Sequence, residues 1–186
     1  MYLDESYLIW KCANESGARP LLGHVLIKRT NVDSGMAVAS DGFILAVVPV
    51  TLDESDRVGL VSAKYLRESL KAAKGTPISL NDTNVGNSKG LFPRYEWDID
   101  GNSEYPEYQN IIPKPPMGST VNVLGINLKL LTRVTQAIGS PKPIILTLCG
   151  GNVSLLLVEH HLRENGVPVP PFGLVMPMHI DPGWQP

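Results

Sequence analysis

Apolar and polar residues along this chain follow one pattern three times: an amphipathic helix is followed by short strands. We expect the first helix to begin at Asp4, a plausible N-cap, and to end at Gly17. The second should run from Ser62 to Gly75 and the third from Asn127 to Gly139. Apolar runs predict strands at residues 24–30, 35–39, 43–48, 57–61, 77–80, 95–99, 121–126, 143–148, 153–158 and 172–178. Helices interspersed with antiparallel strands define an α+β fold class.

Turn-forming residues separate these elements and set the expected domain boundaries. Asp41-Gly42, between two strand-like runs, is a strong hairpin signal, whereas the polar run at residues 81–90 is predicted to be a loop. Prolines between residues 104 and 117 predict an extended, semi-rigid connector. We therefore expect a complete domain of two helix–strand units at residues 1–113, a connector at 114–117, half a domain at 118–180 and a tail at 181–186.

The second predicted helix carries a stripe of basic residues. At 100° per residue they fall within an arc of about 80°, while the leucines of the helix lie on another side that faces a core. The third predicted helix also has basic residues on its polar face. Two interpretations fit: contact with DNA phosphates without base recognition, or an ordinary solvated helix face. The basic residues are Lys64, Arg67, Lys71 and Lys74 in the second helix, and Lys129 and Arg133 in the third.

Composition narrows the class of protein. The 186 residues are 43% hydrophobic and 18% charged, with a net charge of −2, which is typical of a soluble globular protein and not of a generally basic nucleic-acid binder. Any DNA-facing surface must then be a local basic patch. Cys12 and Cys149 lie in apolar settings, and we expect two free thiols. No signal-peptide pattern or membrane-length apolar run is seen, so we expect a cytoplasmic protein without membrane partners.

Enzymatic motifs are missing from the sequence. There is no glycine-rich phosphate loop, no nucleophile elbow and no credible Cys–His pairing. His160 and His161 are adjacent and would point to opposite faces of a strand, which does not suit a single metal ion. We therefore predict no catalytic residues, no metal and no cofactor. One remote alternative is a metal-dependent enzyme in which Asp98 and Asp100, on one face of a strand, hold a hard cation.

Three segments carry a family resemblance. They read Ala39-Ser-Asp-Gly-Phe-Ile-Leu-Ala46, Tyr105-Pro-Glu-Tyr-Gln-Asn-Ile-Ile-Pro113 and Phe172-Gly-Leu-Val-Met-Pro-Met-His179. In this order they resemble the Asp-Gly turn, the linker ending in proline and the terminal Met-Pro-Met strand of the bacterial DNA polymerase III beta subunit family, the sliding clamps. Phe43-Ile44 stands where that family has His-Arg, and His179 stands where it has a terminal Arg.

The resemblance implies a DNA-clamp fold of helix-plus-antiparallel-strand units, amounting to about one and a half clamp domains. It implies a non-catalytic processivity factor of DNA replication or repair, which holds DNA through backbone contacts without sequence specificity. Polymerase or repair-protein peptides would bind an apolar groove. Carried over by matching position, the groove would be lined by Ser40, Gly42, Leu45, Pro113, Val175, Met176, Pro177 and Met178.

The same resemblance leaves the assembly open. Three units per chain fall short of the twelve in a clamp ring, so a closed ring would require a homo-oligomer of four chains. Without a ring, the chain would be a peptide-binding module or a competitor of full clamps that does not encircle DNA. The two alternatives differ in whether the basic helix faces are needed for function.

Overall fold

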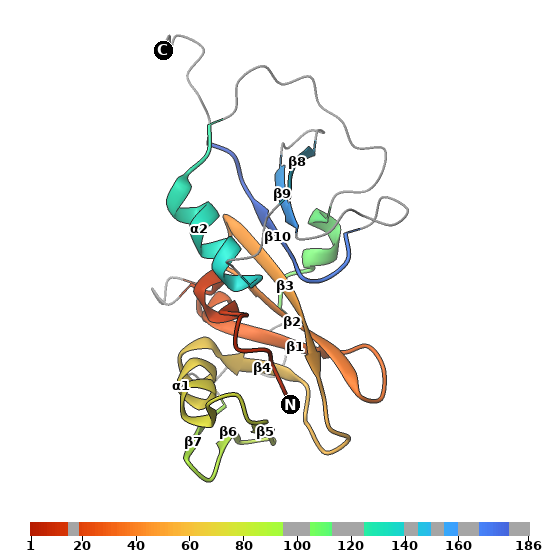
Figure 1. The fold of residues 1–186 in the computed structure, drawn as a ribbon, viewed down its shortest axis with the longest axis vertical. Coiled ribbons are helices and arrows are strands. Elements are labelled where there is room, and N and C mark those ends of the chain that lie inside the picture. The colour runs from red at the N-terminus through yellow and green to blue at the C-terminus, as the bar shows by residue number, and fades with distance from the viewer. Residues whose placement is uncertain are drawn as a thin grey trace.

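One antiparallel sheet of seven strands runs through the molecule, in the order β4-β1-β2-β3-β10-β9-β8. The computed structural model describes residues 1–14, 19–94, 105–112, 125–139, 145–149, 155–159 and 168–178. The sheet twists along the long axis, with α1, the N-terminal helical turn and α2 along one side (Figure 1). Its strands are β1 (His24–Arg29), β2 (Ser34–Ser40), β3 (Ile44–Thr51), β4 (Gly59–Ser62), β8 (Ile145–Cys149), β9 (Leu155–Glu159) and β10 (Phe172–Val175).

Strands from the first and third predicted units meet in the middle of this sheet. β10 pairs with β3 through Val175 and Ile44, Leu174 and Leu45, and on to Phe172 and Val47. β10 also pairs with β9, and β9 with β8, so the third unit extends the sheet formed by the first. The helix-plus-antiparallel-strand architecture expected from the sequence is confirmed.

A second, three-stranded sheet contradicts the loop predicted at residues 81–90. Its strands are β5 (Ser79–Leu80), β6 (Asn84–Asn87) and β7 (Gly90–Pro93), so the predicted loop at residues 81–90 is wrong. The Asn81 side chain accepts hydrogen bonds from the Thr83 and Asn84 amides and forms the turn. The polar residues thus build the turn, while fully buried Val85 anchors the strand. The strand expected at 95–99 lies outside the described residues.

The α-helices in the described part of the chain begin and end near the predicted positions. Helix α2 (Leu128–Ala137) begins after Asn127, whose side chain accepts hydrogen bonds from the amides of Lys129 and Leu130. Helix α1 (Ala63–Ala73) begins after Ser62, but the Ser62 side chain makes no capping hydrogen bond. Their apolar faces are buried as predicted, because Leu66 and Val134 have no exposed surface.

The first predicted helix is wrong. Within residues 4–14 the structure has only a short 3-10 helix, Ile9–Cys12; residues 15–18 lie outside the described part. The Asp4 side chain does accept a hydrogen bond from the Ser6 amide, as an N-cap would. The Leu8 amide, however, donates to the Gln136 carbonyl of α2. A tertiary hydrogen bond thus replaces one that would have extended the helix, and tertiary packing overrides the periodic pattern.

Apolar residues of the central sheet divide cleanly between its two faces. On the helix side, a large core contains Ile9, Ile44, Ala46, Val134 and Val175 among others. The opposite side carries a smaller cluster formed by alternate strand residues. A short 3-10 helix in the connector, Tyr108–Ile111, lies on that side (Figure 1), and Tyr108 is buried in the smaller cluster. Helices and connector therefore occupy opposite faces of one sheet.

Gly173 allows α2 to pack directly on β10. A Cβ placed at this residue would lie 2.2 Å from the Val134 Cγ1 atom and 3.0 Å from the Leu45 carbonyl oxygen. We expect Gly173→Ala to lower the free energy of unfolding by about 1–3 kcal/mol, because the added methyl overpacks this contact. Chemical denaturation measures this. Restored stability in Gly173→Ala/Val134→Ala would identify the clash as the cause, and an unchanged single variant would contradict the packing.

Candidate functional site

Lysine side chains gather on the helix side of the molecule. Lys64, Lys71 and Lys74 of the α1 region are exposed, as is Lys129 at the start of α2. Because α1 and α2 both pack on the helix side of the central sheet, these four lysines belong to one side of the protein. We call them the lysine face.

The basic residues of α1 interact with neighbouring side chains. Arg67 Nε lies 3.0 Å from Glu68 Oε1, and Lys71 Nζ lies 3.5 Å from the same oxygen. The hydrogen bond from Arg67 lowers the pKa of the Glu68 carboxyl, with Lys71 adding to the effect, so Glu68 is charged at neutral pH. Lys64 Nζ lies 5.2 Å from the centre of the Tyr65 ring. Glu68 therefore offsets part of the positive charge at this face.

Arg133 has a different role from the other predicted DNA-facing residues. Its side chain is half-buried and lies 2.7 Å from the Asp41 carboxylate through Nη1. Its other nitrogens donate to the backbone carbonyls of Lys11 and Ala13. Because these hydrogen bonds fasten α2 to the N-terminal segment and to the Asp41 turn, we leave Arg133 out of the lysine face.

The Asp41-Gly42 turn connects β2 to β3, as predicted. Asp41 Oδ1 accepts hydrogen bonds from the amides of Phe43 and Ile44, at 2.9 and 3.0 Å. Asp41 Oδ2 forms the ion pair with Arg133. Gly42 has φ +96°, a conformation that favours glycine. The Ser40 hydroxyl donates to the Ile44 carbonyl and accepts from the Gly42 amide. One carboxylate thus shapes the turn and ties it to α2.

The terminal strand lies beside this turn, because Val175 pairs with Ile44. The Met176 amide donates to the Phe43 carbonyl, and the Met178 amide donates to the Gly125 carbonyl, each at 2.9 Å. Phe43 is 60% exposed and Met178 is 55% exposed, so apolar side chains reach solvent here. Exposed methionines suit a surface that binds varied apolar side chains.

Two predicted groove residues lie on opposite faces of the sheet. Leu45 belongs to the cluster on the connector side, whereas Val175 is buried in the core on the helix side. Leu174 pairs with Leu45 and shares its face, but the sequence prediction missed it. Period-two alternation through Leu174 and Met176 was the signal that could have found it. Pro113 lies outside the described residues.

The structure describes no group of three or more His, Cys, Asp or Glu side chains close enough to hold a metal ion. The alternative site residues Asp98 and Asp100, and the histidine pair at 160–161, lie outside the described ranges. Cys12 is a buried free thiol, and burial raises its pKa, which makes it unreactive. Within the described part of the chain, no helix has the length and apolar character needed to cross a bilayer.

A sheet continuous across units, with helices along one face and a connector across the other, is the architecture of a DNA clamp. The chain has the fold of bacterial beta sliding clamps. It aligns with the Helicobacter pylori beta clamp bound to a DNA ligase peptide at a TM-score of 0.62 and 17% identity, covering 92% of this chain and 61% of that one. No known protein family and no curated protein matches at the sequence level.

Other solved clamps agree with this assignment of fold. The H. pylori clamp in complex with diflunisal aligns at a TM-score of 0.64 and 15% identity, covering 93% of this chain and 62% of that one. The Bacillus subtilis DNA polymerase sliding clamp aligns at 0.54 and 16%, covering 94% and 61%. The chain therefore spans about three fifths of the length of these clamps.

Proposed function

We propose that this protein is a non-catalytic, clamp-like accessory factor of DNA replication or repair. Its lysine face contacts DNA phosphates, and the surface around the Asp41-Gly42 turn and the terminal strand binds partner peptides. The proposal rests on the difference between the two faces of the central sheet. The four exposed lysines of the lysine face lie on the helix side, while the connector covers part of the opposite face of the same sheet.

Few phosphate contacts are sufficient for such a factor. A clamp that surrounds DNA retains it topologically, so that each contact need only be weak and independent of sequence. The chain spans about three fifths of the length of the clamps that share its fold, and we propose that several copies assemble around DNA. The net charge of −2 fits this proposal, because a mildly acidic body confines DNA contact to the lysine face.

Partner binding rests on the apolar surface beside the turn. Leu45 and Leu174 lie on one face of the sheet, and Met176 continues along the same side of the terminal strand. The H. pylori clamp that shares this fold was solved with a DNA ligase peptide. A short apolar peptide is therefore the class of partner that we propose for this surface.

Charge reversal on the lysine face tests the DNA contact. We expect Lys64→Glu/Lys71→Glu/Lys74→Glu to weaken binding to a duplex by more than tenfold at low salt. The slope of log K against log salt should become shallower by roughly 3, about one per lost phosphate contact. Fluorescence anisotropy with a labelled duplex across a salt series measures both quantities.

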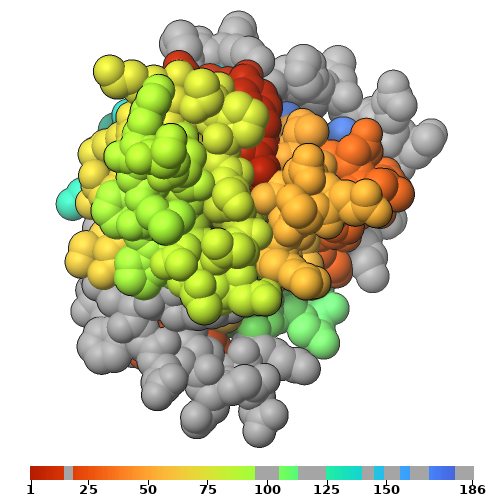
Figure 2. All heavy atoms as spheres, turned by 90° about the horizontal axis from the view of Figure 1, so that it is seen from below, coloured from red at the N-terminus to blue at the C-terminus, as the bar shows by residue number. Residues whose placement is uncertain are grey.

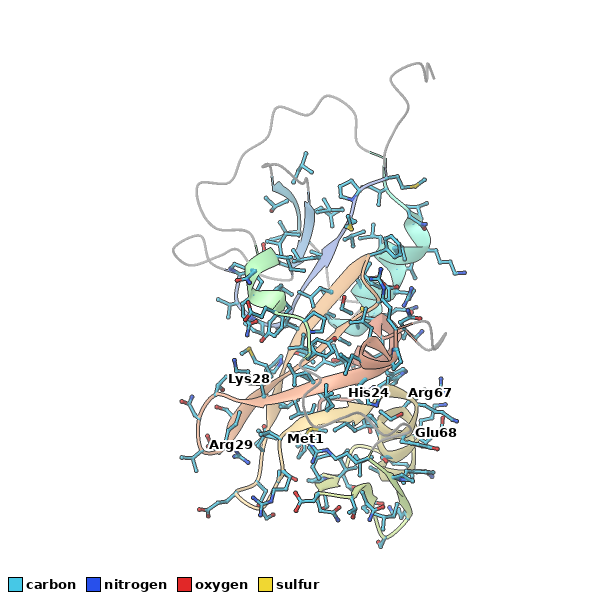
Figure 3. The ribbon with its side chains drawn as sticks, turned by 180° about the vertical axis from the view of Figure 1, so that it is seen from behind. Met1, His24, Lys28, Arg29, Arg67 and Glu68 are labelled. Carbon is cyan, nitrogen blue, oxygen red and sulfur yellow. The ribbon has the colours of Figure 1, made fainter. Side chains whose placement is uncertain are left out.

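Two variants control this experiment. Lys28 comes two residues after Leu26 in β1, so both side chains lie on the connector side of the sheet. Lys28 also lies away from Arg67 and Glu68 (Figure 3). Lys28→Glu should therefore leave the affinity for duplex DNA nearly unchanged. Glu68→Gln should strengthen binding, because it releases Arg67 and Lys71 from their shared carboxylate. Equal weakening by Lys28→Glu, or no gain from Glu68→Gln, would contradict the lysine face as the DNA surface.

A further inference from the structure

A cavity of about 880 Å³ opens on the helix side of the protein. Its lining comes from the N-terminal segment, from α1 and the residues that follow it, from Asp41 and from the α2 residue Arg133. The N-terminal segment lies beside α1 at this end of the molecule (Figure 2). The cavity lies where the sequence predicts a full helix and the structure has only the short 3-10 helix Ile9–Cys12.

The chemistry of this cavity is divided between an aromatic wall and a basic rim. Tyr7 and Trp10 are half-buried and contribute apolar surface, together with Leu70 of α1. Lys71 and Lys74, which follow Leu70 at the end of α1, are exposed in the same lining. Basic residues in the lining outnumber acidic ones by five to three. Asp41 and Arg133 are paired with each other, which leaves four basic and two acidic residues.

We propose that this cavity binds an unpaired nucleotide of single-stranded DNA, with the base against Trp10 and its phosphate beside Lys71 and Lys74. Aromatic surfaces next to lysines are the elements from which proteins build sequence-tolerant single-strand sites, since every base has a stacking face. The volume is that of a small-molecule site and accommodates one or two nucleotides. A base within a duplex is stacked on both sides and does not enter it.

The inference rests on the proposed function, because it assumes that DNA lies on the helix side. It adds that the protein distinguishes single strands from duplexes at a defined place. Lys71 and Lys74 belong to both surfaces, whereas Trp10 belongs to the cavity alone. Trp10 is therefore the residue that separates the two proposals.

Fluorescence of Trp10 tests the cavity. The sequence has three tryptophans, so Trp97→Phe/Trp184→Phe leaves Trp10 as the sole emitter. We expect a 20-residue thymidylate oligonucleotide to quench this emission, and a blunt duplex of equal length to bind without quenching. Trp10→Leu in the natural sequence should weaken oligonucleotide binding by about fivefold or more, and leave duplex binding unchanged. Thermal unfolding checks that each variant is folded, and Lys28→Ser serves as the matched control.

Each outcome decides between the proposals. If neither form of DNA binds, the proposed function and the cavity site both fail. If the duplex binds but the oligonucleotide neither quenches Trp10 nor depends on it, only the cavity site fails. If a poly-glutamate peptide quenches Trp10 as strongly as the oligonucleotide does, the cavity binds acidic peptides and the nucleotide assignment is wrong.

Discussion

Asp56→Ala is expected to lower the free energy of unfolding by about 3–5 kcal/mol, because it leaves a buried positive charge without its partner. The Met1 ammonium forms an ion pair with the Asp56 carboxylate, and the side chains of the two residues are 0% and 3% exposed. The ammonium also donates to the Ile78 carbonyl at 2.6 Å. Tyr2 forms a bridge with Thr51 at the end of β3, and the Ile78 amide donates to the Met1 carbonyl, so this pair holds several elements together.

Further hydrogen bonds increase the expected effect. Asp56 accepts from the amide of Asp53 at 2.8 Å and from that of Leu80 at 3.0 Å. Alanine removes these acceptors, and each buried amide left without one adds a desolvation penalty. Because Leu80 belongs to β5 of the small sheet, β5–β7 should loosen first.

Denaturation in urea, compared with a matched variant, measures this prediction. Asp82 forms an ion pair with Arg57 at 3.6 Å, but its side chain is 81% exposed. Asp82→Ala removes the same carboxylate from a solvated pair and should change stability by less than about 1 kcal/mol. Similar losses for the two variants would show that the Asp56 pair contributes no more than a surface pair.

Arg133→Ala is expected to cost about 2–3 kcal/mol and to loosen the Asp41-Gly42 turn. The guanidinium bonds to Asp41 and to the carbonyls of Lys11 and Ala13, so one side chain joins α2, the N-terminal segment and the turn. Hydrogen bonds to charged groups contribute more than neutral ones, and three are lost here. We expect Arg133→Ala to weaken peptide binding beside the turn as well as stability, because the Asp41 carboxylate also positions Phe43.

A double-mutant cycle isolates the ion pair within this network. Asp41→Asn keeps an oxygen to accept from the Phe43 and Ile44 amides, and it removes only the charge that faces Arg133. We expect a coupling energy of about 1–2 kcal/mol between Arg133→Ala and Asp41→Asn in urea denaturation. Additive effects would mean that Arg133 acts through its backbone acceptors alone.

The sequence predicted the fold where local and tertiary signals agree. Asn127 caps α2, and the Asp41-Gly42 turn forms the expected hairpin. It failed where tertiary contacts decide. The Leu8 amide donates to α2, so the first helix does not form. Val85 is buried, and its burial stabilises β6 within the polar run at residues 81–90. Periodicity along a single segment contains neither of these long-range contacts.

The candidate site was predictable in part for the same reason. Helical periodicity placed Lys64, Lys71 and Lys74 on an exposed face, where the structure has them. It could not show that Arg133 turns inward to Asp41, because that partner is 92 residues away. Matching by motif also treated Val175 and Leu45 as neighbours, although strand alternation places them on opposite faces.

Mass-spectrometric footprinting of lysines, with and without duplex DNA, tests whether the lysine face is the DNA surface. We expect DNA to protect Lys64, Lys71, Lys74 and Lys129 from an amine-reactive reagent. Lys28, on the connector side, should react at the same rate in both samples. Protection of Lys28 with continued reaction of the lysine face, or unchanged rates at every lysine under conditions in which DNA is bound, would contradict the proposed DNA surface.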